Sequence, residues 1–492
     1  MSARLLAAAR RVLHLALDAH RDDPARTRWL RGQLDRLDEP LRVAVAGKVK
    51  AGKSTLVNAL VGERVAPTDA GECTKVVTWY RDGRVPRVVM QPKDGPPIPL
   101  PVDRRDGALV IDLVGTAVER LDRLVVDWPA QALRAATLID TPGVFSTSEA
   151  VGRRTLAFLD PEDEKPTEAD AVIYLMRHLH ATDAAFLESF RDRAVARATS
   201  VNTVAVISRA DEIAGGRVDA MFSARHIAQR YRGEPTLRAL CQNVVAVSGL
   251  IAETGRTLRQ SEFAALAELA REPKETLDAE LLTVARFLKG GDRVVREGLL
   301  ARFGLFGIRL STSLLRQGSN SAAALAGELI ARSGLAELER VLHTQFAERR
   351  DLLKARSALL AVDAVLSPAH RAGPLGRELE RILAGAHEFV ELRQLAALRS
   401  GSVGLPKPVA AEAERLLGDA GTAVPVRLGL PPDVPPHEIR RAAFAALERW
   451  QRFAENPMFT RAATDVCRVV VRTCEAMLVG MAQAAPLRAG PR

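Results

Sequence analysis

Short apolar runs that end at turn residues alternate with helical stretches between Leu41 and about residue 249. The runs are rich in β-branched residues, as buried strands are, and they cover residues 42–46, 75–80, 85–90, 135–139, 171–176, 201–207 and 244–247. Since strands and helices that alternate build a sheet covered on both faces, this part is predicted to be a doubly wound α/β domain with a mixed sheet. Asp82-Gly83 separates two of the runs and predicts a hairpin turn.

Helical periodicity dominates from about Gly249 to about Met481, and it also covers the first 38 residues, with an interruption near Asp23-Pro24. Residues 401–408 and 418–436 are dense in Gly and Pro, so they predict a loop or tip with a short helix between them. The helices before the α/β segment and those after it are expected to pack together as an elongated antiparallel bundle.

A chain of 492 residues is too long for one compact core. The pattern predicts N-terminal helices over 1–38 that pack with the later bundle. An α/β domain follows over 39–348, with a helical insertion over about 255–330. The remainder, 349–492, is expected to be an all-α bundle or stalk with its tip at about 401–436.

Composition limits the partners and the cellular compartments that the sequence predicts. The net charge is +10, but 60 acidic residues are spread among 70 basic ones without a basic block, so no nucleic-acid partner is expected. The four cysteines lack metal-ligand spacing, which fits a reducing cytosol. The N-terminus reads as an amphipathic helix rather than an export signal. No run of about 18 uncharged apolar residues is present, so no transmembrane helix is predicted and any membrane contact is expected to be peripheral.

The motif Gly47-Lys48-Val49-Lys50-Ala51-Gly52-Lys53-Ser54 stands between a predicted strand and a predicted helix that begins at Thr55. Its glycines let backbone N–H groups encircle phosphates, Lys53 neutralises the β- and γ-phosphate charge, and the Ser54 hydroxyl joins a Mg²⁺ shell. The motif therefore predicts a nucleoside triphosphate site in a P-loop domain.

Two further elements fit the same site. Asp140-Thr141-Pro142-Gly143 ends a strand, where Asp140 can reach Mg²⁺ through a water and the Gly143 N–H can sense the γ-phosphate. Thr74, just before a strand, is the natural second protein ligand for Mg²⁺, on a loop that orders with the γ-phosphate. Taken singly, these are also ordinary turn and strand-opening residues.

The nucleobase is predicted from two later strand ends. Asp211, in Ser208-Arg209-Ala210-Asp211, can accept hydrogen bonds from the N1–H and 2-amino group of guanine, which adenine lacks. The Arg209 stem would cover one face of the base, and a backbone amide at Ser248-Gly249 could meet the guanine oxygen. Together these motifs predict GTP as substrate, GDP as product and Mg²⁺ as cofactor.

With these motifs the chain resembles the GTPase superfamily, more narrowly the bacterial dynamin-like proteins and the isoniazid-inducible Ini proteins of mycobacteria. The resemblance is carried by residues 47–62, 66–69, 124–129, 302–307 and 353–359. It implies a GTPase head on a helical stalk, with self-association through heads or stalk, lipid contact at a stalk tip, membrane remodelling or fusion, and in many cases a paralogous partner. The expected location is cytoplasmic, peripheral on the inner face of the plasma membrane.

The chain departs from that family's pattern at two places: Ser208 and Arg209 stand where Asn or Thr and Lys are usual, and Lys50 replaces a usual Ser. In addition, nothing in the sequence replaces the glutamine that orients water in Ras-like enzymes. Lys50 could stabilise transition-state charge as an arginine finger does. Alternatively, Lys50 or Lys48 points to solvent or holds a partner head, and the sequence leaves both readings open.

The Gly/Pro-rich tip is the candidate membrane contact. Its apolar residues stand beside Lys407 and Arg427 and could insert shallowly into an anionic bilayer, or could pack back onto the bundle; they are Val403, Leu405, Val409, Val424, Val426, Leu428 and Leu430. The favoured function is a dynamin-like GTPase coupled to assembly on membranes. The alternatives are an RNA- or ribosome-associated assembly GTPase, and a regulatory GTP-binding switch that acts through a paralogous partner.

Overall fold

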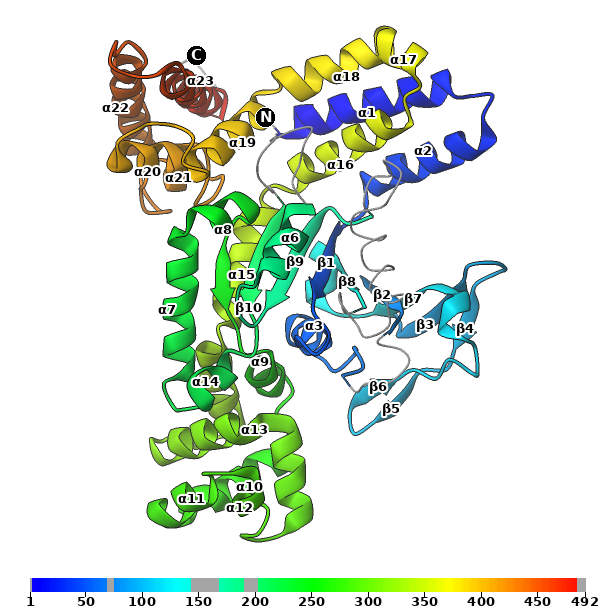
Figure 1. Cartoon of the computed structure of the whole chain (residues 1–492), viewed down its shortest axis with the longest axis vertical. Coiled ribbons are helices and arrows are strands. Elements are labelled where there is room, and N and C mark those ends of the chain that lie inside the picture. The colour runs from blue at the N-terminus through cyan, green and yellow to red at the C-terminus, as the bar shows by residue number, and fades with distance from the viewer. Residues whose placement is uncertain (1, 69–74, 143–167, 190–201, 485–492) are drawn as a thin grey trace, which may run out of the picture.

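The computed structural model describes residues 2–68, 75–142, 168–189 and 202–484. Its centre is a mixed nine-stranded sheet in the order β11-β10-β9-β1-β8-β2-β7-β3-β4 (Figure 1). The strands are β1 Leu41–Gly47, β2 Val77–Asp82, β3 Arg87–Pro92, β4 Ile98–Leu100, β7 Leu121–Trp128, β8 Ala136–Asp140, β9 Ala171–Met176, β10 Thr203–Ile207 and β11 Val244–Ala246. A separate hairpin joins β5 Asp103–Arg105 to β6 Ala108–Val110.

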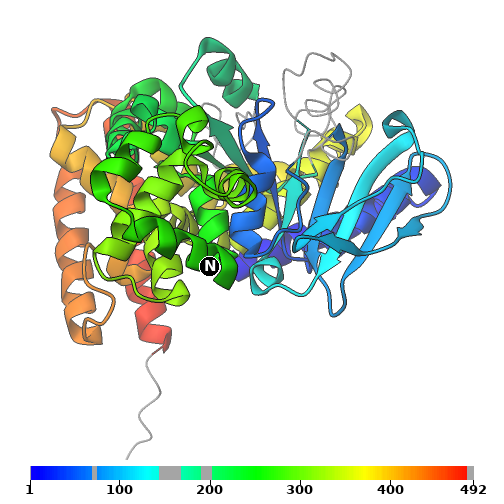
Figure 2. The ribbon, with the colours of Figure 1, turned by 90° about the horizontal axis from the view of Figure 1, so that it is seen from below.

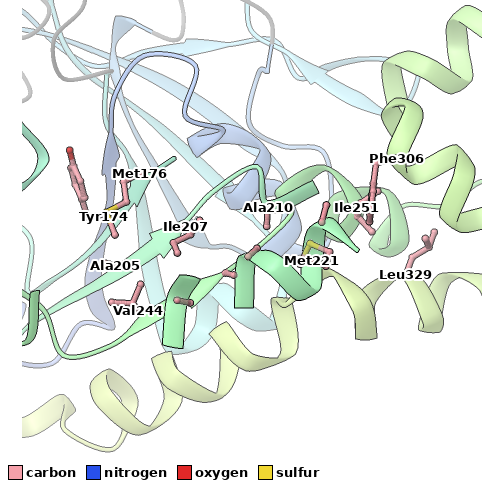
Figure 3. Close-up of a cluster of buried hydrophobic side chains, with 14 of the residues drawn as sticks. Tyr174, Met176, Ala205, Ile207, Ala210, Met221, Val244, Ile251, Phe306 and Leu329 are labelled. Carbon is pink, nitrogen blue, oxygen red and sulfur yellow. The ribbon is translucent and has the colours of Figure 1, made fainter. Parts of the chain in front are cut away.

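The continuous apolar runs of the sequence reflect burial of the sheet on both faces. Along β1, Ala44 and Ala46 belong to one core, whereas Val43 and Val45 belong to another on the opposite face. Figure 3 shows part of the first core, where Tyr174, Ile207 and Val244 of the sheet lie with residues from the helices that cover it. The α/β fold class predicted from the sequence is confirmed.

The hairpin predicted at Asp82-Gly83 is wrong. The chain does reverse between β2 and β3, but β7 lies between these strands, parallel to β2 and antiparallel to β3. Strand β7 supplies Val125 to one core and Val126 to the other. An apolar strand from later in the chain therefore occupies the place that local pairing would have given to β3.

Helices cover both faces of the sheet and extend beyond it. Those of the α/β part are α3 Lys53–Val61, α4 Gln131–Ala135, α6 Ala181–Ser189, α7 Ala220–Gly233, α8 Pro235–Leu240, α9 Gly249–Arg256 and α15 Leu335–Leu342. An insertion forms a lobe at one end of the long axis of the molecule (Figure 1). It contains α10 Gln260–Arg271, α11 Lys274–Glu280, α12 Val284–Phe287, α13 Arg293–Arg316 and α14 Ala322–Ser333.

Helix α13 is the one described helix long and apolar enough to cross a membrane by length and composition, where the sequence had predicted none. Its backbone leaves the helical conformation at Gly304, which has φ of +61°. Phe303, Phe306 and Ile308 on either side are buried in the same core as the sheet. This packing is that of a core helix of the insertion.

The remaining helices form two cores beside the sheet (Figure 1). In the first, α1 Ser2–Ala19 and α2 Pro24–Arg36 pack on α16 Arg350–Val365, α18 Pro374–Gly385 and α19 His387–Arg399, with α17 Pro368–Ala372 joining α16 to α18. In the second, α19 packs with α20 Lys407–Leu416, α22 Pro436–Ala454 and α23 Arg461–Ala484, beside the short α21 Val424–Arg427. The predicted combination of an α/β head and an all-α helical part is confirmed.

The Gly/Pro-rich segment 401–436 is not an exposed apolar tip, and that prediction needs correction. Val403 is buried in the second helical core, Leu405 and Leu428 pack against it, and Val426 and Leu430 are half-buried. Polar contacts also hold the segment against the α/β part, since Arg399 binds both Gln242 and Asp419. The apolar side chains gain more by joining this core than by facing water.

Candidate nucleotide site

The phosphate end of the site is the turn between β1 and α3. Gly47 has φ of +149°, and a Cβ there would lie 2.5 Å from the Leu175 carbonyl oxygen of β9, so only glycine fits. Gly52, at φ +90°, caps the N-terminus of α3. Lys50 also has a left-handed backbone, at φ +61°. The turn therefore aims backbone N–H groups and the positive end of the α3 dipole at one point, as phosphate binding requires.

Lys53 and Asp140 lie buried beneath this turn. The Lys53 Nζ donates to the carbonyl oxygens of Gly47 and Lys48 at 3.3 and 3.2 Å. Burial lowers the pKa of Lys53 and raises that of Asp140, although their mutual attraction opposes both shifts. Both groups are thus pushed toward neutrality, and a bound phosphate and cation would favour their charged forms.

Ser54 and Asp140 form the predicted metal-binding pair. The hydroxyl of Ser54, in the first turn of α3, donates to Oδ2 of Asp140, at the end of β8, at 2.6 Å. The other oxygen, Asp140 Oδ1, is buried without a hydrogen-bond partner among the described residues. A hydroxyl and a carboxylate with a spare oxygen fit Mg²⁺, which prefers oxygen ligands and few protein contacts.

Lys48 does not point into the phosphate turn. Its ammonium forms an ion pair of 2.9 Å with Asp183 of α6, a carboxylate that is 1% exposed. Asp183 also accepts from the Tyr174 hydroxyl at 2.7 Å and from the His180 N–H at 3.1 Å. The contact fastens the phosphate turn to α6. Sequence reasoning missed Asp183, because no local pattern marks a partner so distant in the chain.

The base end of the site is a cavity of ≈ 240 Å³ between the phosphate turn and β10. It is lined by Ala51, Gly52, Thr55, Leu56, Leu175, Val206, Ser208, Arg209, Asp211, Glu212, Val247, Gly249 and Leu250. Asp211 is 8% exposed, and burial raises its pKa while hydrogen bonding from Ser248 opposes the rise. Ser248 caps α9 by accepting from the Ile251 N–H at 3.3 Å.

The guanidinium of Arg209 donates to Glu212 at 2.6 Å, which holds the side chain at the rim of this cavity. Val49 and Lys50 are exposed at the outer side of the phosphate turn, and Lys50 makes no ion pair within the described residues. Thr74 and Gly143 lie outside the described residues. The structure therefore brings the phosphate, metal and base candidates to one edge of the sheet, where the carboxyl ends of β1, β8, β9 and β10 meet.

This fold and site define a P-loop nucleotide-binding domain. The signature of the dynamin family matches residues 43–94, which include the phosphate turn. The isoniazid-induced protein IniC of Mycobacterium tuberculosis (strain CDC 1551 / Oshkosh) is 43% identical over 484 residues, covering 95% of this chain and 97% of that protein. A bacterial dynamin-like protein of Nostoc punctiforme is 30% identical over 147 residues, 28% of this chain and 20% of that protein.

The chain therefore belongs to the family of IniC, within the bacterial dynamin-like proteins. Among solved structures, one described as an oligomerised bacterial dynamin pair for long-range sensing and tethering of membranes is similar at a TM-score of 0.31. It has 13% identity and covers 98% of this chain and 76% of that one. At that distance the likeness adds nothing to the assignment, which depends on the sequence relatives.

Proposed function

We propose that this chain binds GTP with Mg²⁺ and hydrolyses it to GDP and phosphate. The observation that carries the proposal is the meeting of two incomplete sites at one sheet edge. Asp140 keeps a buried oxygen that has no hydrogen-bond partner in the part of the chain that the structure describes, beside Ser54, and Asp211 lines a cavity next to the same phosphate turn. A nucleotide with its phosphates on the turn and guanine in the cavity would satisfy both carboxylates.

Each residue has a distinct part in this proposal. Ser54 and Asp140 would hold Mg²⁺, which neutralises phosphate charge when bound. Lys53 lies between the turn and Asp140 and would pair with phosphate oxygens. Asp211 would select guanine, because the carboxylate would stay buried and unpaired against adenine. The proposed roles of Thr74 and Gly143 as metal ligand and γ-phosphate contact complete the site.

The second part of the proposal concerns assembly. Membership of a dynamin-like family supports coupling of the GTPase cycle to self-association and to peripheral contact with an anionic membrane on the cytoplasmic face. A paralogous dynamin-like partner is compatible with the same site. A regulatory switch would keep the nucleotide contacts described above but would turn over GTP slowly in the absence of that partner.

The proposal is tested by GTP turnover of the full chain across a range of protein concentrations, with and without Mg²⁺ and anionic vesicles. We expect Mg²⁺-dependent turnover whose rate per molecule rises with protein concentration and with vesicles. Failure to bind GTP with Mg²⁺ present would refute the first part. A rate per molecule that is independent of concentration and vesicles would refute the second.

Substitution of Lys50 tests the hydrolysis step more sharply, and the same substitution of Lys48 is the matched control. Lys50 is exposed at the phosphate turn and forms no ion pair with any residue that the structure describes, whereas Lys48 pairs with Asp183. If Lys50 stabilises transition-state charge, Lys50→Ser lowers kcat and leaves GTP affinity intact, and Lys48→Ser mainly weakens GTP binding by loosening the turn. Unchanged kcat with unchanged affinity for Lys50→Ser would end a catalytic role.

A further inference from the structure

The buried carboxylate of Asp183 accepts hydrogen bonds from three different parts of the chain. Asp183 stands in the first turn of α6, and its side chain is 1% exposed. Its Oδ2 accepts from the Lys48 ammonium at 2.9 Å and from the His180 N–H at 3.1 Å, and its Oδ1 accepts from the Tyr174 hydroxyl at 2.7 Å. A buried carboxylate is costly without such partners, and the charged one comes from the phosphate turn.

The backbone of Lys48 is at the centre of the phosphate turn. Its carbonyl oxygen accepts from the Ala51 N–H at 3.1 Å, which closes the turn, and from the Lys53 ammonium at 3.2 Å. The other acceptor of Lys53 is the adjacent Gly47 carbonyl oxygen, at 3.3 Å. A shift of Lys48 would therefore move the ammonium that is proposed to pair with phosphate oxygens.

The support behind Lys48 is fixed on the side of the sheet as well as on the side of α6. Tyr174 lies on β9, which pairs with β1 through Gly47, the residue just before Lys48. Burial, with the Asp183 carboxylate as a second cause, raises the pKa of the Tyr174 hydroxyl, so this group stays a donor. Figure 2 shows α6 close to the end of β1 from which the phosphate turn leads. Asp183 thus joins β9, α6 and the turn.

The ion pair is better explained by position than by stability. Apolar side chains of similar volume often stabilise a protein as well as a buried ion pair does, so stability alone does not require a lysine at this place in the turn. What the pair provides is a fixed distance between α6 and the residue whose carbonyl oxygen holds Lys53. Groups that bind phosphate act best when their supporting contacts are fixed in advance.

We propose that Asp183 is a positioning residue of the nucleotide site and acts through Lys48 on Lys53. The proposal rests on the proposed function, because it assumes that this turn binds the phosphates of GTP. The turn encloses the phosphates that GTP and GDP share, whereas Thr74 and Gly143 are the groups proposed to respond to the γ-phosphate. Loss of the contact with Asp183 therefore weakens the binding of both nucleotides.

The test is a double-variant cycle on the full chain, with GTP and GDP affinities measured by calorimetry in the presence of Mg²⁺. Asp183→Asn removes the carboxylate charge at nearly constant volume, and Lys48→Met removes the ammonium but keeps the apolar stem. Each single variant should lose about tenfold or more in affinity for both nucleotides, as happens when the residues that support a metal ligand are removed. The double variant should lose no more than Lys48→Met alone, because Asp183 then has no partner through which to act.

The matched control is Tyr174→Phe, which removes a hydrogen bond from the same carboxylate and leaves its ion pair with Lys48 in place. We expect this control to lower the temperature of unfolding and to leave nucleotide affinity nearly unchanged. Thermal unfolding of every variant shows which of them fold. If Asp183→Asn does not fold, Lys48→Met and Tyr174→Phe decide the matter, since the Lys48 side chain is 35% exposed and its change leaves the core intact.

Nucleotide affinity at the wild-type level in Lys48→Met or in folded Asp183→Asn would overturn the proposal. So would losses that add up in the double variant, since the two residues would then act separately, or an equal loss in Tyr174→Phe, which would show a merely structural role. Each of these results leaves the proposed function standing, because wild type still binds GTP. Failure of wild type to bind GTP would overturn the proposed function and this proposal together.

Discussion

Two buried carboxylates on either side of β1 have opposite environments. Asp170, just before β9, accepts from Arg36 at 3.0 Å and from the Arg42 N–H at 3.0 Å, and it pairs with Lys354 at 3.3 Å. Asp140, at the end of β8, accepts from Ser54, and within the described ranges its other oxygen has no hydrogen-bond partner. The first carboxylate is therefore fully partnered within the protein, whereas the second has the spare oxygen that the proposed metal site requires.

The pKa values follow the same division. Burial alone would raise the pKa of Asp170, but Arg36, Lys354 and the Arg42 N–H hold it below its ordinary value. Burial does raise the pKa of Asp140, because Lys53 and Ser54 compensate it incompletely. Asp170 therefore joins α2, β1 and α16 through its ion pairs and hydrogen bonds, whereas ionised Asp140 would need the proposed cation to offset the cost of its burial.

The largest expected effect is a loss of stability when the cluster of Asp170, Arg36 and Lys354 is broken. Asp170→Asn leaves Arg36 and Lys354 buried without their counter-ion, so the free energy of unfolding should fall by about 3–5 kcal/mol. Chemical denaturation measures it. Asp122→Asn is the matched control, since its side chain is 47% exposed and pairs with Arg123 at the surface. A loss no greater than in the control would contradict this role of Asp170.

The same cluster should make stability depend on pH. A carboxyl with a lowered folded pKa binds its proton more readily when unfolded, so its contribution is fully present above the ordinary value near 3.8. That contribution is lost as the pH falls through the lower folded pKa. Acid titration of the free energy of unfolding should show this loss in wild type and a smaller one in Asp170→Asn; parallel curves would count against it.

Asp211 is buried and lines the cavity at the base end of the site, so its removal should change nucleotide choice rather than stability. Asp211→Asn replaces an acceptor of guanine donors, so GTP affinity should fall by about a hundredfold while ATP affinity changes little. Fluorescent GTP and ATP analogues measure both. Asp219→Asn is the control, since its side chain is 53% exposed, pairs with Arg217 and lies outside the lining of this cavity. Equal GTP affinity in Asp211→Asn and Asp219→Asn would remove Asp211 from base recognition.

The smallest effect is expected at Asp140, and its sign is opposite to that at Asp170. A raised folded pKa means that the nucleotide-free protein loses stability as the pH rises from near 3.8 through the folded value. Asp140→Asn removes this penalty, so the protein without nucleotide or metal should be unchanged or more stable, by about 1 kcal/mol. Thermal unfolding with EDTA at neutral pH measures it. If Asp140→Asn destabilised the protein as much as Asp170→Asn does, the two carboxylates would not differ in the way described above.

The sequence could predict those features that are formed by residues close together in the chain. The phosphate turn lies within eight consecutive residues, and Asp140 and Asp211 each follow an apolar strand, whose carboxyl end places them at one edge of the sheet. The Lys48–Asp183 and Asp170–Lys354 pairs escaped notice because each joins distant segments, and no spacing rule connects them.

Predictions made from local composition were wrong where tertiary packing determines the structure. Gly and Pro marked 401–436 as irregular, but could not show that Val403 and Leu428 would meet α22 and α23 in a common core. Asp82-Gly83 marked a reversal correctly, yet the insertion of β7 beside β2 depended on a strand about forty residues later.

The most direct test of the central claim is the GTP affinity of wild type and Asp140→Asn, each measured by calorimetry with Mg²⁺ and with EDTA. If the incomplete carboxylate is kept for the cation, Mg²⁺ strengthens GTP binding to wild type by at least about tenfold and leaves the variant nearly unchanged. Equal strengthening in both proteins, or none in wild type, would contradict it.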